Sequence, residues 1–289
     1  MSFRTIAITK RAKLNLTMGF LEIREENTTK VFLDDIDVLL IESQAVSMTA
    51  ALVSELMKKK IKEIFCDEKR NPQAELIPYY GSGDSSRKIK RQIAWNDSAK
   101  EEVWTCIVRE KIRNQYLFLK ELGKKRETEL LESYMDELTS GDQTNREGLA
   151  AKVYFNALFG MGFRREEETP INAALNYGYA LLLSTVNKEI AYNGYITQLG
   201  LFHDNIYNPF NLASDLMEPF RVLVDRMVYE NQFQQFGTEE KHTMLHLLER
   251  EVILGNNKQV FTNAIRIYVR SIFDALCDGD TGEILFYSL

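Results

Sequence analysis

The spacing of apolar residues changes along this chain of 289 residues, and this change limits the possible folds more than any other feature. Over roughly the first 45 residues apolar and polar side chains alternate, as in residues 13–17 and 20–23, which is the period of half-buried strands. Residues 38–41 are apolar throughout, as in a strand buried on both faces. From Ser47 the spacing becomes helical, with Leu52, Leu56 and Ile61 on one side. The pattern predicts a small β-rich N-terminal domain, residues 1–79, with one helix.

Turn-forming residues mark the end of this domain. Pro72, Pro78 and the glycine- and serine-rich segment 80–86 predict a linker at residues 80–86. Beyond it nearly every segment has helical period, so residues 87–289 are predicted to form a larger all-α C-terminal domain. The predicted fold class is therefore α+β, with the β-rich domain first.

Capping patterns predict where the helices begin. Ser98-x-x-Glu101 and Thr144-x-x-Glu147 have the form of capping boxes, and Pro170 suits the first turn of a helix that runs to about residue 192. Further helices are expected at residues 212–229, 238–254 and 259–276.

The net charge of −6 argues against a protein that coats DNA or membrane with its whole surface. Residues 86–126, however, hold 12 basic and 5 acidic side chains, with Trp95, Trp104, Tyr116 and Phe118 among them. Such a stretch is compatible with a DNA-facing surface, because phosphate neutralisation needs a local stripe. The alternative is a solvated helix with ion pairs within one turn, such as Glu110 with Arg113.

Three widely spaced cysteines, Cys66, Cys106 and Cys277, predict reduced thiols rather than a disulfide framework. No apolar run reaches the roughly 18 to 20 residues that a membrane helix needs. A soluble, cytoplasmic protein without a membrane partner is expected.

His203 lies in an irregular segment just before a predicted helix that carries Asp215 and Glu218. An imidazole beside two carboxylates is a ligand set that suits Mg²⁺ or Mn²⁺. The alternatives are that Asp215 caps its helix or pairs with Arg221, and that Glu218 is a surface carboxylate. Glu147 poses the same choice between a capping residue and a metal ligand.

His242 and His246 lie four residues apart on a predicted helix, and Glu249 follows one turn later. This spacing allows a zinc site, but the intervening residues are not those of a zinc protease. An ordinary surface pair is favoured.

Three motifs support a resemblance to a known family. They read NREGLAAKVYF at residues 145–155, NAALNYGY at 172–179 and HDNIYNPFNLASDLMEPFR at 203–221. Together they resemble the CRISPR-associated integrase family, the DNA-integrating endonuclease subunit of the spacer-acquisition complex, and the third motif resembles the type II branch. The resemblance extends over essentially the whole chain and makes the helical domain the catalytic one.

The resemblance implies a metal-dependent endonuclease and integrase. It inserts short foreign DNA fragments into a CRISPR array as new spacers, by attack of a fragment's 3′-hydroxyl on repeat phosphodiesters. The implied catalytic residues and ligands of Mg²⁺ or Mn²⁺ are Glu147, His203 and Glu218, with Asp215 as a secondary candidate. Candidate DNA contacts, from the basic stretch and from positions in or near the motifs, are Lys88, Arg91, Arg146, Lys152, Arg164, Arg165 and Arg221.

The implied partners are the prespacer duplex, the CRISPR repeat, a second copy of the chain and a small ferredoxin-like CRISPR-associated protein. The second copy is expected to bind through the β-rich domain. In the type II branch the RNA-guided effector nuclease and a ring-forming accessory protein also take part. One rival is a non-catalytic DNA-binding scaffold of the same complex. The other is a helical regulatory protein with a solvated basic helix.

Overall fold

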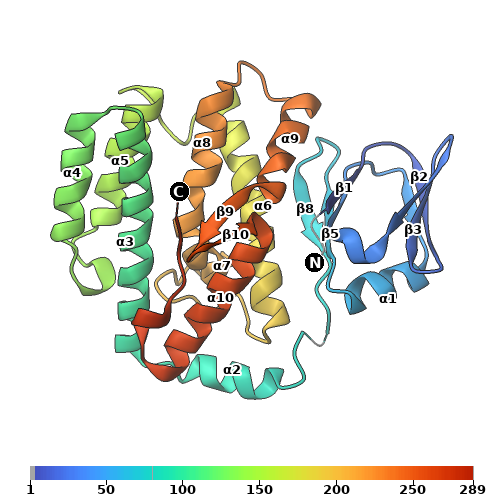
Figure 1. Cartoon of the computed structure of the whole chain (residues 1–289), viewed down its shortest axis with the longest axis horizontal. Helices are drawn as coiled ribbons and strands as arrows, with labels where there is room; N and C mark the ends of the chain where they lie inside the picture. The colour runs from blue at the N-terminus through green and yellow to red at the C-terminus, as the bar shows by residue number, and fades with distance from the viewer. Residues whose placement is uncertain (1–3, 80, 289) are drawn as a thin grey trace. The chain divides into compact units, whose positions relative to one another are not determined.

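The computed structural model describes residues 4–79 and 81–288, and the chain divides into two units, Met1–Gly81 and Ser82–Leu289. The first unit is rich in strands and the second is mainly helical (Figure 1), which confirms the α+β prediction. Residues 1–3 of the predicted β-rich domain, Tyr80 of the predicted linker and Leu289 lie outside the described residues. Dimerisation through the β-rich domain remains a prediction.

Two four-stranded sheets form the N-terminal unit. In the first, β1 (Arg4–Ile8), β5 (Ile36–Ile41) and β7 (Lys62–Cys66) are parallel, and β8 (Pro72–Glu75) is antiparallel to β7. The second has the order β4 (Thr28–Phe32), β3 (Phe20–Arg24), β2 (Ala12–Thr17), β6 (Val46–Met48).

One helix, α1 (Ala50–Lys58), contributes Leu52 and Leu56 to the core of this unit, where they join buried leucines of both sheets. The helix expected from Ser47 begins later than predicted, because Thr49 caps it and Val46–Met48 pair with β2. It also ends before Ile61, which is buried beyond the helix. A pairing with a strand more than 30 residues away leaves no local signal in the sequence.

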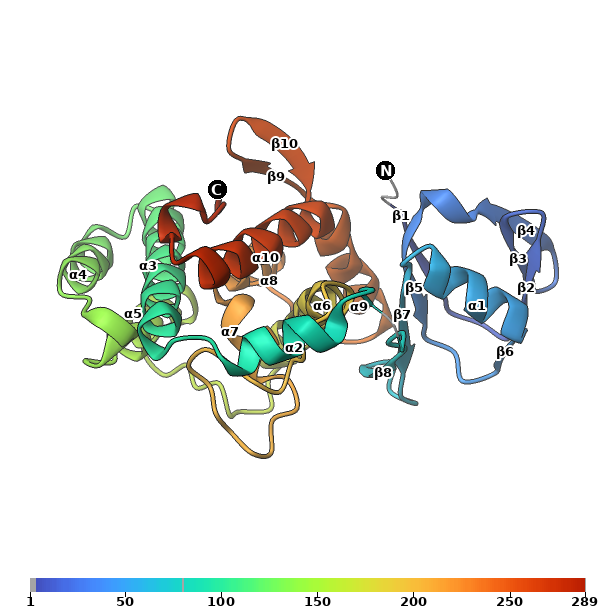
Figure 2. The ribbon, with the colours of Figure 1, turned by 90° about the horizontal axis from the view of Figure 1, so that it is seen from below.

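Helices dominate the C-terminal unit. They are α2 (Ser85–Ile93), α3 (Asp97–Glu121), α4 (Lys125–Asp136), α5 (Arg146–Phe159), α6 (Pro170–Tyr192), α7 (Asn211–Leu216), α8 (Arg221–Asn231), α9 (Thr238–Leu245) and α10 (Phe261–Asp278). Helices α3, α4 and α5 lie side by side (Figures 1 and 2). Helix α6 begins at Pro170, as predicted.

Close packing of α6 against α8 and α9 depends on Gly178. A Cβ atom at this position would lie 2.5 Å from Val224 Cγ1 and 2.7 Å from Met244 Cε. Only a residue without a side chain allows this approach.

A three-stranded sheet interrupts the helical pattern, and the sequence analysis missed it. It has the order β10 (Asn257–Val260), β9 (Glu251–Leu254), β11 (Tyr287–Ser288), and Figure 2 shows the β9–β10 hairpin beside α10. The helix predicted at residues 238–254 is therefore wrong beyond Leu245. The two residues between the paired Leu254 and Asn257 are Gly255 and Asn256, a hairpin signal that the helical interpretation overlooked.

Both predicted capping boxes are wrong in detail. Asn96, rather than Ser98, caps α3 by accepting a hydrogen bond from the Ser98 backbone N–H. Asn145, in the left-handed conformation at φ 52°, caps α5 by accepting from the Gly148 N–H. The Glu147 side chain is therefore not needed as a cap and is available to the site described below.

Cys66, Cys106 and Cys277 form no disulfide bond within the described residues, as predicted. None of the helices within residues 4–79 and 81–288 combines the length and the apolar content that a bilayer crossing requires.

Candidate active site

One face of α3 supports the whole candidate site. Trp104, Lys111 and Phe118 are spaced seven residues apart, so they lie along the same side of the helix, and all three are buried. The first two contact the segments that carry the histidine and the carboxylates of the sequence motifs.

Pro219 breaks the helix that the sequence predicted at residues 212–229. Between α7 and α8 the chain forms a single 3₁₀ turn, Glu218–Phe220, because proline has no backbone N–H to continue a helix. The carbonyl of Pro219 accepts hydrogen bonds from Asn114 Nδ2 at 3.2 Å and Tyr287 Oη at 2.9 Å. This turn directs the Glu218 side chain toward α3.

The ammonium of Lys111 joins two of the predicted ligands. Its Nζ donates hydrogen bonds to Glu147 Oε1, on α5, and to Glu218 Oε2. The Lys111 and Glu218 side chains are 7% and 6% exposed, whereas that of Glu147 is 28% exposed. Burial by itself would lower the pKa of Lys111, but the two carboxylates outweigh it and the pKa is raised.

Glu218 lies between two cations. Its second oxygen, Oε1, accepts a hydrogen bond from Arg221 Nε at 2.8 Å. Burial would raise the pKa of Glu218, but Arg221 and Lys111 lower it to about 2, so the carboxyl is ionised at neutral pH. Glu218 is therefore a buried carboxylate rather than the surface residue of the alternative interpretation, and Arg221 pairs with it rather than with Asp215.

Asp215 is fully buried and holds the segment that carries His203. Its Oδ2 accepts from the backbone N–H groups of Leu201 at 2.6 Å and Phe202 at 3.1 Å. Its Oδ1 accepts from the N–H of His203 at 3.2 Å and contacts His203 Nδ1 at 2.5 Å. A Cβ atom on Gly200 would lie 2.3 Å from the His203 carbonyl, so the turn requires glycine. These contacts aim the Nε2 side of the imidazole away from Asp215.

His203 is also fixed by aromatic packing. The Trp104 and Phe202 rings stack with centroids 4.7 Å apart, and the His203 ring meets Trp104 edge-on at 5.9 Å. The hydrogen bond with Asp215 raises the pKa of His203, against the lowering effect of burial, and the charges of Glu218 and Glu147 raise it further. His203 therefore lies in the electrostatic field of both carboxylates.

A pocket of about 230 Å³ opens beside the carboxylates, lined by residues that include Lys111, Glu147, Arg165, Tyr179 and Glu218. The second motif builds one wall of this pocket. Asn172 and Asn176 accept hydrogen bonds from Arg165 at 2.6 and 2.7 Å, and the Arg165 guanidinium lies over the Tyr179 ring at 5.4 Å. The motif at residues 172–179 therefore positions a cation.

Asp225 closes the inner end of the pocket. It is 1% exposed and accepts a hydrogen bond from Tyr179 Oη. Burial raises the pKa of Asp225 to about 6, although the hydrogen bond with Tyr179 and the charge of Arg221 oppose this shift.

The remaining predicted DNA contacts lie elsewhere. Arg146 pairs with Glu137 at 2.7 Å, and Lys152 and Arg164 are exposed outside the pocket lining. On α2, Lys88 pairs with Asp84 at 3.3 Å, and Arg91 Nη1 lies 3.9 Å from Cys277 Sγ. Of the seven predicted contacts, the structure brings only Arg165 and Arg221 to the carboxylates.

Three of the four aromatic residues of the basic stretch face inward. Trp95, Trp104 and Phe118 are at most 8% exposed, so they belong to the core and cannot stack on DNA bases from the surface, whereas Tyr116 is half-buried. The pair of Glu110 and Arg113 forms at 3.0 Å, but Glu110 is buried, so α3 is not the solvated helix of the alternative interpretation.

Across residues 4–79 and 81–288, no three His, Cys, Asp or Glu side chains are arranged as a ligand set for a metal ion. At the candidate site, the Lys111 ammonium lies between Glu147 and Glu218. At the possible zinc site, His246 Nδ1 lies 3.8 Å from Glu249, and both side chains are largely exposed.

Comparison with known proteins decides the family. The family model described as CRISPR associated protein Cas1 matches residues 6–259. This chain belongs to the Cas1 family. The CRISPR-associated endonuclease Cas1 of Neisseria meningitidis serogroup C is 38% identical over 229 residues, which cover 79% of this chain and 75% of the relative. The CRISPR-associated endonuclease Cas1 1 of Pyrobaculum aerophilum is 29% identical, covering 74% and 77%.

Solved structures share the Cas1 fold. A casposase bound to an integration product superimposes with a TM-score of 0.76 at 17% identity, covering 97% of this chain and 92% of the casposase. The Cas1 protein of Thermotoga maritima gives a TM-score of 0.75 at 17% identity, covering 96% and 98%. The assignment to the type II branch remains a prediction.

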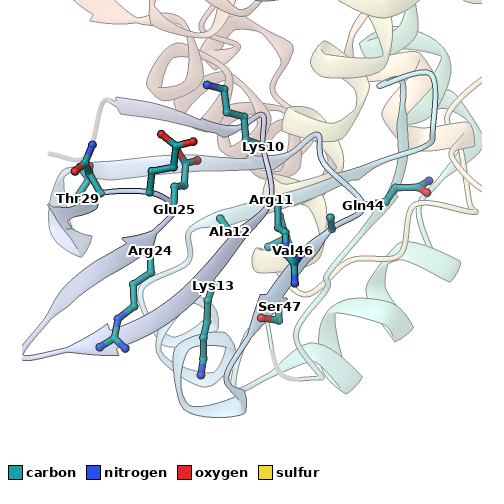
Figure 3. Close-up of a pocket in the computed structure, with 13 residues that line it drawn as sticks. Lys10, Arg11, Ala12, Lys13, Arg24, Glu25, Thr29, Gln44, Val46 and Ser47 are labelled. Carbon is teal, nitrogen blue, oxygen red and sulfur yellow. The ribbon is translucent and has the colours of Figure 1, made fainter.

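The strand-rich unit of this Cas1-family chain holds a larger groove of about 1110 Å³ (Figure 3). Lys10, Arg11 and Lys13 line it together with Glu25 and Glu26, and none of the three cations forms an ion pair among the described residues. Lys13 lies directly opposite Arg24 on neighbouring strands, and Figure 3 shows both side chains pointing the same way. Like charges opposite each other destabilise a sheet, and only Arg24 is compensated, by Glu22 at 2.7 Å.

Three contributors to the Cas1-family site were not predicted from the sequence, namely Lys111, Tyr179 and Asp225. The sequence places Lys111 in the basic stretch, which hides its role in the site. A signal was present, because Lys111 follows Ile107 and Val108 by one turn on the apolar side of α3. Tyr179 ends the second motif, although the motif alone assigns it no role, and Asp225 carried no comparable signal.

Proposed function

We propose that this chain is a divalent-metal-dependent DNA endonuclease and integrase that inserts short DNA fragments into a CRISPR array. The observation that carries the proposal is the meeting of Glu147 and Glu218 at one cation in a chain of the Cas1 family. The casposase of similar fold, which is bound to an integration product, is consistent with such chemistry.

The donor set fits Mg²⁺ or Mn²⁺. Glu147 and Glu218 offer carboxylate oxygens, which hard divalent cations prefer, and neutral His203 offers Nε2. The two carboxylates already share one cation, the ammonium of Lys111. We infer that Glu147, His203 and Glu218 hold the metal and that Asp215 orients His203, since both Asp215 oxygens are engaged by the segment that carries the histidine.

A bound divalent metal supplies Lewis-acid polarisation of a phosphate oxygen. The chain's own residues do the rest of the positioning. Arg165 and Arg221 face the pocket, and guanidinium groups bind phosphate oxygens through paired N–H donors. Because Arg221 uses only Nε for Glu218, its amino groups can reach a phosphate. The site holds a repeat phosphodiester while the 3′-hydroxyl of the fragment forms the new P–O bond and the repeat's own 3′-oxygen leaves.

DNA outside the pocket is expected to meet exposed cations. The groove of the strand-rich unit is the best candidate there, because its four cations, Lys10, Arg11, Lys13 and Arg24, outnumber the two acids in its lining, Glu25 and Glu26. On α2, Lys90 is a further exposed cation. These residues would bind the phosphate backbone and position the DNA, and such contacts do not distinguish one base sequence from another.

The proposed partners follow from the family. Solved structures of similar fold include a complex that contains both Cas1 and Cas2, with a TM-score of 0.72 at 17% identity. We propose that this chain forms a homodimer that binds a small ferredoxin-like CRISPR-associated protein and DNA. Participation of an RNA-guided effector nuclease and a ring-forming protein depends on the type II assignment.

A non-catalytic scaffold is the alternative within the same family. It would bind DNA and its protein partner through the same surfaces but would not join DNA. The buried, charge-matched carboxylates favour the catalytic interpretation, because burying ions for a scaffold alone is costly.

The decisive experiment measures joining of short duplex DNA to a repeat-containing plasmid, with the small partner present. We expect joining only with Mg²⁺ or Mn²⁺ and its loss in His203→Ala and Glu218→Ala. The matched controls are His246→Ala and Glu121→Ala, whose side chains are 74% and 54% exposed. Joining without metal, or full activity in both site variants, would overturn the proposal.

A further inference from the structure

Lys111 occupies an unusual position for a lysine. It projects from the apolar side of α3, one turn after Ile107 and Val108, and only 7% of its side chain is exposed. Lysine is almost never fully buried unless its charge is paired, because desolvating an ammonium is costly. The ion pairs with Glu147 and Glu218 therefore offset the cost of burying the Lys111 ammonium, and the ammonium offsets the negative charge of the two carboxylates.

The hydrogen bonds of Lys111 tie together three separate elements. The ammonium on α3 binds Glu147 on α5 and Glu218 on the turn between α7 and α8. Without a cation, these two carboxylates would repel each other in a partly desolvated site. Lys111 thus supplies the charge that allows both acids to converge.

The pocket lining holds as many basic side chains as acidic ones. Lys111, Arg165 and Arg221 face Glu147, Glu218 and Asp225 from the pocket lining. A divalent cation placed on the same carboxylates would add two positive charges beside the Lys111 ammonium. A divalent cation bound to Glu147 Oε1 and Glu218 Oε2 would lie beside the ammonium that now contacts the same two oxygens, and the two cations would repel each other.

We propose that Lys111 is a positioning residue that takes the place of the metal in the metal-free protein. Its ammonium holds Glu147 and Glu218 together and gives up their oxygens when a divalent cation binds. This inference rests on the proposed metal site. The observation behind it is that the Lys111 ammonium contacts an oxygen of each glutamate.

Removing the charge should then lower the stability of the metal-free protein and raise its affinity for Mn²⁺. In Lys111→Met the metal-free protein loses the cation that offsets carboxylate repulsion, so its Tm falls. The metal no longer competes with an ammonium, so the Kd for Mn²⁺ decreases by at least ~10-fold. A merely structural role for Lys111 would lower the Tm without tightening metal binding.

The experiment combines calorimetric titration of Mn²⁺ with thermal unfolding, with and without Mn²⁺, for the full chain and its variants. Lys120→Met is the matched control, since Lys120 lies on the same helix, is exposed and donates only to the Tyr116 hydroxyl at 3.1 Å in the described hydrogen bonds. We expect the control to match the unmodified protein in both measurements. Unchanged or weaker Mn²⁺ affinity in Lys111→Met overturns the inference.

A second route applies if metal-free Lys111→Met does not fold. Lys111→Gln keeps an N–H donor for one carboxylate but removes the charge, and it should also bind Mn²⁺ more tightly. In the unmodified protein, acylation followed by mass spectrometry should show more labelling of Lys111 when Mn²⁺ is added, relative to Lys120. Equal or reduced labelling of Lys111 contradicts the displacement of its ammonium.

Glu218→Gln separates this inference from the proposed function. If the unmodified protein binds no Mn²⁺, or if Glu218→Gln binds it equally well, the proposed metal site fails and the role of Lys111 fails with it. If Glu218→Gln loses Mn²⁺ binding while Lys111→Met binds as the unmodified protein does, only the role of Lys111 is refuted.

Discussion

Two charged regions of this Cas1-family chain differ in whether their cations are paired with carboxylates. In the groove of the strand-rich unit, Lys10, Arg11 and Lys13 are exposed and lack ion-pair partners among residues 4–79 and 81–288. In the pocket of the helical unit, Lys111 and Arg221 are each bonded to buried or half-buried carboxylates. The first arrangement attracts phosphate from solution, whereas the second fixes the positions of specific atoms.

This difference predicts different responses to mutation and salt. Exposed charges act through a screened field that falls off over about 10 Å at moderate ionic strength. Buried pairs are screened little, and removing one partner leaves an uncompensated charge. The groove should therefore govern how tightly DNA binds, and the pocket should govern whether DNA is joined.

The largest effect is expected from Glu218→Gln. It removes the carboxylate charge between Lys111 and Arg221, so joining should fall by more than the roughly 100-fold that loss of a supporting residue causes. The measurement is the rate of plasmid joining at saturating DNA, with Glu121→Gln as the exposed control. An activity within tenfold of the unmodified protein would remove Glu218 from the reaction.

Asp215→Asn should have the next largest effect. Both oxygens of Asp215 accept backbone N–H bonds, so an amide group would turn one donor toward another donor. We expect Mn²⁺ affinity to fall by about 10- to 100-fold, as for other residues that orient a ligand. Asp204→Asn, in the same segment but exposed, is the control, and equal affinities of the two variants would argue against the orienting role.

The pH dependence of metal binding should be smaller and should depend on His203. Asp215 raises the pKa of His203, and Glu218 and Glu147 add to the effect, so protons compete with metal at a higher pH than at a free histidine. Below this raised pKa, Mn²⁺ affinity should fall by about tenfold per pH unit. In Asp215→Asn the fall should begin at a lower pH.

The metal-free protein should show the opposite trend. Because the folded-state pKa of His203 is raised, the protonated form stabilises the fold fully below the unfolded pKa, and this contribution is lost as pH rises through the folded pKa. Thermal unfolding without metal at pH 6 and 8, for the unmodified protein and His203→Gln, isolates this contribution. A raised pKa predicts a larger difference between the two pH values in the unmodified protein.

The smallest effect should come from the groove. Replacing Arg11 and Lys13 by alanine should weaken DNA binding several-fold and should reduce the slope of log K against log salt by about 0.9 for each phosphate that the protein no longer neutralises. Joining at saturating DNA should be unchanged. Lys58→Ala is the control, since Lys58 is 71% exposed in the same unit but pairs with Glu55. An unchanged salt slope would mean that DNA does not use this groove.

The sequence predicted the architecture because its signals are local. The alternation in residues 13–17 and 20–23 and the helix that begins at Pro170 both follow from short-range periodicity. One error arose where a distant segment overrode that periodicity, since Val46–Met48 became a strand by pairing with β2. The other was a local signal that was overlooked, because Val252 and Leu254 pair across the two-residue turn of the β9–β10 hairpin.

Only part of the candidate site could be predicted from local sequence patterns. The motifs contain Glu147, His203 and Glu218, and the structure brings the first and third to one ammonium. Sequence proximity gave equal weight to Arg146 and Arg165, although only Arg165 lines the pocket. The hydrogen bonds that Arg165 donates to Asn172 and Asn176 hold its side chain at the pocket. Arg146 leaves α5 in another direction and pairs with Glu137.

The sequence by itself thus determined the two-part fold, the family and the residues that carry the motifs, because each depends on residue type and spacing along a short segment. Only the tertiary structure decided that Lys111 joins the two glutamates, which lie 36 and 107 positions away from it. It also decided that Asp215 holds His203 across 12 positions. Interactions over such separations depend on how the helices pack, and packing is set by the whole core rather than by any local pattern.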